Sequence, residues 1–183
     1  MMKWLAIGVG VIVAIVLIVV LIGAMLPQSH VAVRSAKFRR PATEMFRTIT
    51  DVASAASWRK DVQRIEMLPP KDTRIAWREV SKDGAVNYEG EIVRSPAPGM
   101  AGRFISRITG KNLPYGGEWI TDVAERDGGS VVTVMEKGEV YNPIFRFVSK
   151  FVMGHSATID AYLRALGRHV GEEVTPADAS SAG

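Results

Sequence analysis

The C-terminal stretch from Asn142 to Val170 has the pattern of one long amphipathic helix. Asn142 is a favourable N-cap, and Pro143 suits the first helical position, where a backbone N–H is not needed. Large apolar side chains follow at helical spacing: Ile144, Phe147, Val148, Phe151, Val152, Ile159, Tyr162, Leu163, Leu166 and Val170. Burying them would contribute roughly 15–30 kcal/mol before conformational entropy is subtracted. The helix therefore needs a broad apolar surface opposite it, and Gly154 predicts a bend within it.

The middle of the chain supplies such a surface as strands in which apolar and polar side chains alternate. The candidate strands span His30–Phe38, Val62–Leu68, Arg74–Val80, Ala85–Arg94, Gly102–Thr109, Tyr115–Ala124 and Ser130–Val140. Two short helices, Ala42–Thr50 and Val52–Trp58, follow the first strand. Short turn-forming links indicate antiparallel neighbours. We therefore predict an α+β domain over residues 30–171, in which the helix covers the apolar, aromatic face of the sheet. Residues 172–183 are expected to be a disordered tail.

The N-terminal run from Trp4 to Leu26 carries no charge and is rich in Val, Ile and Leu. As a helix it would be roughly 35 Å long, which is enough to cross the hydrocarbon core of a bilayer. A cleaved signal peptide is the alternative, but the run exceeds a typical signal core and no A-x-A site follows it before Pro27. We expect residues 4–26 to be a transmembrane anchor, joined to the domain by a very short linker.

Composition limits the chemistry of the domain. The chain has no cysteine, which excludes disulfides, thiolate catalysis and cysteine metal ligands. Its three histidines are too scattered in the sequence to propose a metal site. The formal net charge is +4, but no Lys/Arg block is dense enough to indicate nucleic-acid binding. No Ser/His/Asp or Cys/His arrangement points to a catalytic site, and no cofactor is expected.

Three segments carry a resemblance to a known superfamily. They are Thr50-Asp51 through Ser57-Trp58-Arg59, the turn from Leu113 to Trp119, and Gly138 to Pro143 running into Phe145-Arg146-Phe147. Over roughly residues 30–171 the chain resembles the START-like superfamily, also called SRPBCC or Bet v 1-like, and most resembles its bacterial polyketide cyclase/dehydrase and lipid transport branch. The resemblance implies a helix-grip fold with a deep apolar cavity between sheet and helix. Members bind lipids, sterols, quinones, polyketides or plant hormones, and a minority catalyse cyclisation or dehydration.

Aromatic side chains are the first candidates for lining such a cavity. Those expected to point inward are Trp58, Trp77, Tyr88, Phe104, Trp119, Phe147 and Phe151. For any single one of them, simple core filling is the alternative. His155 could hydrogen-bond a ligand or act as a general base, but no partner can be named for it, so a structural role is favoured. Glu136 would be a polar anchor if it pointed inward. A slip of one residue reverses its direction, and the surface position is favoured.

These features predict a membrane-anchored domain that binds a hydrophobic small molecule such as a lipid, an isoprenoid quinone or a polyketide-like compound. Two alternatives stay open: a cyclase or dehydratase that uses His155 or a buried glutamate, and a non-catalytic subunit of a membrane protein complex. The resemblance implies a bacterial inner membrane crossed once. Lys3 favours a cytoplasmic N-terminus, and the opposing cations Arg34, Lys37, Arg39 and Arg40 belong to the folded domain, so the balance favours a periplasmic domain.

Overall fold

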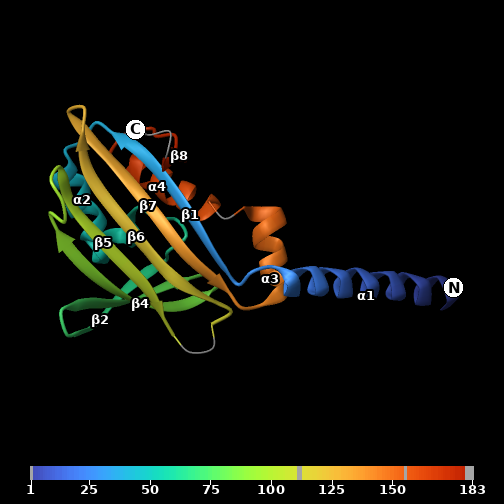
Figure 1. Ribbon diagram of the computed structural model, residues 1–183. Coiled ribbons are helices and arrows are strands. Elements are labelled where there is room, and N and C mark those ends of the chain that lie inside the picture. The colour runs from blue at the N-terminus through green and yellow to red at the C-terminus, as the bar shows by residue number, and fades with distance from the viewer. Residues whose placement is uncertain (1, 111–112, 155, 180–183) are drawn as a thin grey trace.

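The computed structural model describes residues 2–110, 113–154 and 156–179. An apolar helix, α1 (Met2–Met25), projects from a curved sheet, and helices α2 and α4 lie on the concave side of that sheet (Figure 1). The strands are β1 (Ser29–Phe38), β2 (Arg64–Lys71), β3 (Arg74–Ser81), β4 (Gly84–Arg94), β5 (Met100–Thr109), β6 (Tyr115–Arg126), β7 (Gly129–Val140) and β8 (Ala177–Asp178). The other helices are α2 (Ala42–Thr50), the 3-10 helix η1 (Val52–Ser57), α3 (Pro143–Val148), the π-helix η2 (Ser149–Met153) and α4 (Ala157–His169).

The sheet has the strand order β2-β3-β4-β5-β6-β7-β1-β8, and every pairing in it is antiparallel. The predicted α+β class is therefore confirmed. The outer face is the polar one that the alternation predicted. Arg103 lies 2.6 Å from Asp122 there, and Glu118 accepts hydrogen bonds from both Arg107 and Lys137.

The core lies between α2, α4 and one half of the concave face of the sheet. Val123, Val132 and Val134 are fully buried there, and so are three residues of α4, Ile159, Leu163 and Leu166. Residue spacing explains the contact. The three α4 residues recur at intervals of three and four, which places them on one helix face. Val132 and Val134 are two residues apart on β7, which places them on one face of the strand.

The expected single helix from Asn142 to Val170 is interrupted. Its start is as predicted, because the Asn142 Oδ1 accepts from the backbone N–H of Ile144 at 2.9 Å. Gly154 has a φ of 75°, which is incompatible with a continuing right-handed helix. The bend predicted at Gly154 is thus a complete break. The first part of the helix, α3 and η2, lies beside α1 instead of continuing α4 along the sheet (Figure 1).

The last segment differs from the disordered tail expected for residues 172–183. Over its described part, to residue 179, the chain returns to the sheet, where β8 pairs with β1. Arg34 holds it in place, since its guanidinium donates to the Asp178 Oδ1 at 2.7 Å and to the carbonyl oxygen of Pro176 at 3.0 Å. The small polar residues of the tail do not by themselves predict this pairing, because their partner Arg34 lies far away in the sequence.

The helix α1 contains one stretch, Ala6–Met25, that is long and apolar enough to cross a membrane. A signal sequence or the core helix of a soluble protein would pass the same test. In this structure the stretch is almost entirely exposed, so it contributes little to the core of the domain.

Candidate functional site

The half of the concave face nearest to α1 is only partly buried, although Tyr162 of α4 contacts Trp119 there. Its residues belong to two adjacent cross-strand rows. Trp77 pairs with Tyr88 in one row, and Ser106 pairs with Trp119 and Trp119 with Glu136 in the other. Tyr88, Ser106, Trp119 and Glu136 are each neither fully buried nor exposed. The two rows together form an aromatic surface with polar groups on it that stays partly accessible.

Glu136 points inward, so the surface position favoured from the sequence is wrong. One carboxylate oxygen, Oε1, lies 3.1 Å from the Nε2 of His30, and the other, Oε2, accepts from the indole N–H of Trp119 at 2.9 Å. The side chains of His30 and Glu136 are only 14% and 18% exposed. A charged carboxylate that is this well covered needs such partners, because an unpaired one would be strongly disfavoured.

The local sequence explains how the histidine reaches this carboxylate. His30 pairs with Gly138 across the β1–β7 ladder. A Cβ at position 138 would lie 2.3 Å from the imidazole ring, so only glycine leaves room for the ring in this position. The alternation of β7 could have indicated the inward direction of Glu136, since Val132 and Val134 share its parity. His30 was missed, because its place at the end of the linker suggested no role.

A second acidic group lies on the same face at the β2–β3 side of the sheet. The Oε1 of Glu79 accepts from Arg59 at 2.9 Å and from the indole N–H of Trp77 at 3.2 Å. Arg59 also donates to Asp61 at 2.7 Å. Burial acts to lower the pKa of Arg59, but the charges and hydrogen bonds of Glu79 and Asp61 outweigh it and raise that pKa. Arg59 therefore remains a fixed cation.

Aromatic rings connect these polar groups. Tyr162 of α4 lies between Trp58 and Trp119, with centroid distances of 5.5 and 5.4 Å. Trp77 stacks on Tyr88 at 5.3 Å. Burial raises the pKa of Tyr162 to about 12 and also raises the pKa of Tyr88, so both phenols are neutral at physiological pH. Within the described residues, the buried Nε1 of Trp58 has no hydrogen-bond acceptor.

The structure brings five of the eight predicted site residues together on the concave face. Trp77 and Phe104 are buried in the core, whereas Trp58, Tyr88 and Trp119 are half-buried beside it. Phe147 and Phe151 do not join them. Their rings contact each other at 4.9 Å on α3 and η2, and Phe151 is 58% exposed. His155 lies outside the described residues.

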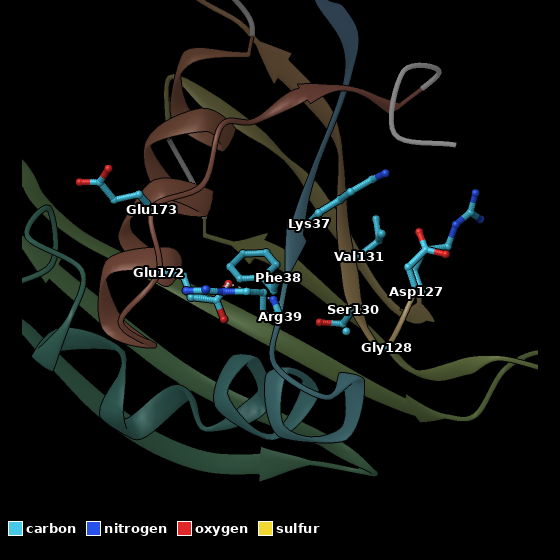
Figure 2. A pocket seen from close by; sticks show the side chains of 11 residues that line it. Lys37, Phe38, Arg39, Asp127, Gly128, Ser130, Val131, Glu172 and Glu173 are labelled. Atoms are coloured by element: carbon cyan, nitrogen blue, oxygen red, sulfur yellow. Dashed lines mark hydrogen bonds and ion pairs between the residues drawn. The ribbon is translucent and has the colours of Figure 1, made fainter.

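The resemblance implied a deep cavity beneath the long helix, but two surface hollows of the domain lie elsewhere. Ile159, Leu163 and Leu166 fill the space under α4. One surface hollow of about 390 Å³ lies at the end of β1 and beside the β6–β7 turn (Figure 2). Another, of about 420 Å³, shares the turn residues Arg126–Gly129. The carboxylate of Glu172 lines the first hollow, but it already accepts from the backbone N–H of Arg39 at 2.9 Å. We interpret it as an anchor for the C-terminal segment.

Metal-dependent chemistry has no support from the geometry. Over residues 2–110, 113–154 and 156–179 there is no group of three or more histidine and acidic side chains that could hold a metal ion. The chemical capacity of the site therefore resides in the pair of His30 and Glu136, the donors from Trp58 and Trp119, and the surrounding rings. Such a surface can bind an apolar molecule and hydrogen-bond to its polar end.

The fold is shared with many solved structures of low sequence identity. A START superfamily protein from Mycobacterium smegmatis matches with a TM-score of 0.57 at 10% identity, over 78% of this chain and 97% of its own. Norcoclaurine synthase from Thalictrum flavum, in complex with a transition-state analogue, matches with a TM-score of 0.59 at 8% identity, over 78% of this chain and 94% of its own. The di-domain ARO/CYC protein BexL matches with a TM-score of 0.52 at 15% identity, over 83% of this chain and 50% of its own.

Neither a family model nor a curated protein sequence matches the chain. The structural likenesses show that the chain has the START/Bet v 1-like helix-grip fold, as the sequence resemblance implied. At these identities they define the fold alone. The function has to be argued from the residues of the concave face.

Proposed function

We propose that the protein is a membrane-tethered module that binds a small hydrophobic molecule on the half-buried part of its concave face nearest to α1. The observation that carries the proposal is the row of half-buried aromatic side chains that ends at the hydrogen-bonded group of His30, Trp119 and Glu136. These side chains are only half-buried beside α4, where Tyr162 contacts Trp119, and they offer apolar area together with polar anchors.

The polar groups indicate what the bound molecule would carry. Each Glu136 oxygen already accepts one hydrogen bond and can accept another from a ligand hydroxyl. The Trp58 N–H has no acceptor among the described residues, and a buried donor left unpaired is unfavourable by about 1–3 kcal/mol. A ligand carbonyl or hydroxyl oxygen would supply the missing acceptor. These donors and acceptors suit a lipid, an isoprenoid quinone or quinol, or a polyketide-like compound with oxygen at one end.

The anchor supports a membrane source for the ligand. Ala6–Met25 exposes nearly all of its apolar side chains, and a bilayer would bury them. β1 begins at Ser29, so the tether between the helix and the sheet is very short. Holding the domain at the surface raises the local concentration of membrane-dissolved ligands. A single pass through a bacterial inner membrane, with the domain on the periplasmic side, is the arrangement that we propose.

Native mass spectrometry of the full chain, purified in bilayer nanodiscs of native lipid, tests this function. We expect a bound molecule that chromatography and mass spectrometry can identify after extraction. Ser106→Leu places a larger side chain in the middle of the row and should remove it. Arg107→Leu, on the opposite face of the same strand, should keep it. A wild-type domain that is empty under these conditions and takes up neither lipid nor quinone would contradict the proposal.

Acid–base catalysis on the same surface is a second candidate, favoured by the distance of 3.1 Å between His30 Nε2 and Glu136 Oε1. A cyclase or dehydratase would convert its ligand, so the extracted molecule should lose the mass of one water or change retention time with incubation. His30→Ala and Glu136→Gln should stop this change while the fold remains intact. A ligand that stays unaltered in the wild type would exclude this candidate.

A further inference from the structure

The segment formed by α3 and η2 exposes four large apolar side chains. Ile144 and Phe145 are 41% and 49% exposed, and Phe151 and Val152 are 58% and 72% exposed. The break at Gly154 separates these side chains from α4, so none of them serves the core of the domain. An apolar cluster of this kind on a short helical segment needs an apolar environment of its own.

Direct backbone contact fixes the position of this segment relative to α1. Gly23 is buried against α3, and a Cβ at this position would lie 2.0 Å from the carbonyl oxygen of Pro143. The Arg146 guanidinium donates to the carbonyl oxygen of Leu26 at 2.8 Å and to that of Ala24 at 3.4 Å. These carbonyls at the C-terminus of α1 lack helical partners, and a cation is favourable beside them.

These contacts hold α3 and η2 beside the C-terminal end of α1. The contacts involve residues 23–26, which form the end of the apolar helix nearest to the domain (Figure 1). If α1 spans the bilayer, this end lies at the boundary between acyl chains and headgroups. The exposed Phe and Val side chains then meet the lipid interface, and Lys150 on η2 is exposed where headgroup phosphates lie.

We propose that α3 and η2 form a membrane-interface element whose apolar side chains insert among the lipids. This proposal depends on α1 being the membrane tether of the proposed function, and it adds two features. It gives the domain a second contact with the bilayer, so that the domain cannot rotate freely on its linker. It also turns the half of the concave face nearest to α1, which contains His30 and Glu136, toward the membrane.

The absence of cysteine from the chain makes this inference testable with single-cysteine variants. Phe151→Cys and Val152→Cys in the full-length protein, each labelled with the environment-sensitive fluorophore NBD, would be placed in vesicles of phosphatidylethanolamine and phosphatidylglycerol. Ala97→Cys, in the exposed β4–β5 loop at the opposite end of the sheet, is the matched control. Leu17→Cys, within α1, reports on the anchor. Lipids with a spin label near the headgroup or deep in the acyl chain serve as quenchers.

We expect a blue shift and headgroup-level quenching at positions 151 and 152, deep quenching at position 17, and neither effect at position 97. Deep quenching at 17 without quenching at 151 and 152 would overturn the interface element and leave the tether intact. A lack of quenching at 17 would overturn both. A blue shift at 151 and 152 without lipid quenching, growing with the protein-to-lipid ratio, would identify a second protein copy as the occupant and would also refute the proposal.

Discussion

Replacing Glu136 by methionine tests whether its inward carboxylate is a buried hydrogen-bond acceptor that stabilises the fold. Methionine keeps a similar length and apolar stem but accepts no strong hydrogen bond. The change therefore leaves the Trp119 N–H, which now donates at 2.9 Å, without its acceptor, and it removes the contact between Glu136 and His30. A buried donor that loses its partner destabilises a protein by about 1–3 kcal/mol. The Glu136 side chain is 18% exposed, so water can replace part of the loss, and we expect about 2 kcal/mol.

A double-mutant cycle with Trp119→Phe separates this effect from a general loss of packing. Phenylalanine removes the indole donor, so in the Glu136→Met background no unpaired indole remains. The double variant should then be less destabilised than the sum of the two single variants by about 1 kcal/mol. Unfolding by urea in detergent micelles, followed by far-UV circular dichroism, gives the free energies. Glu91→Met, on the exposed face of β4, is the control and should change stability by less than about 0.5 kcal/mol.

Two results would refute the reasoning. If Glu136→Met is no more destabilising than Glu91→Met, the carboxylate is not a buried hydrogen-bond acceptor. If the two changes at positions 136 and 119 are additive, the bond between them contributes nothing measurable to the folded state.

Other positions give further predictions for the same unfolding assay. Leu163→Ala should destabilise the domain by about 2–5 kcal/mol, because the Leu163 side chain is fully buried on the core side of α4, whereas Arg164→Ala on the exposed side of the helix should change stability little. Hydrogen bonds from Lys137 and Arg107 lower the pKa of Glu118, so its stabilising contribution is present above the ordinary glutamate pKa and is lost as pH falls through the lower folded value; Glu118→Gln should reduce the loss of stability in acid, and an unchanged acid profile would contradict this. Burial raises the pKa of Tyr162 to about 12, so the unfolded state loses its proton first and stability should fall as pH rises from 10 to 12. Tyr162→Phe should weaken that alkaline loss, and an identical loss in both proteins would count against burial of the phenol.

The strands and the N-terminal apolar helix could be predicted because their signals are local. Alternation of apolar and polar side chains is a property of a few consecutive residues, and it places every strand from β1 to β7 within a few positions. The direction of Glu136 was also contained in this pattern, since it shares the parity of Val132 and Val134. The preference of a charged residue for water suggested the opposite. The inward direction of Glu136 is stabilised by its partners His30 and Trp119 on other strands. These partners could not be identified from the sequence, because they lie far from Glu136 along the chain.

The remaining differences depend on contacts between distant segments. Gly154 signals a bend, but the departure of α3 and η2 from the sheet depends on the bonds that Arg146 makes to the end of α1. The order of the C-terminal segment depends on Arg34, and its composition alone resembles that of a disordered tail. For Phe147 and Phe151, helical periodicity predicted one common face with α4. The break at Gly154 separates Phe147 and Phe151 from the face of α4 that packs on the sheet.

Photocrosslinking tests the central claim of a ligand surface on the concave face most directly. The full-length protein in nanodiscs would be irradiated with a diazirine-bearing isoprenoid quinone, and tandem mass spectrometry would map the modified residues. The account predicts adducts at Tyr88, Ser106 and Trp119 that Ser106→Leu suppresses and Arg107→Leu preserves. Adducts confined to α1, α3 and η2, or to the outer face of the sheet, would contradict it.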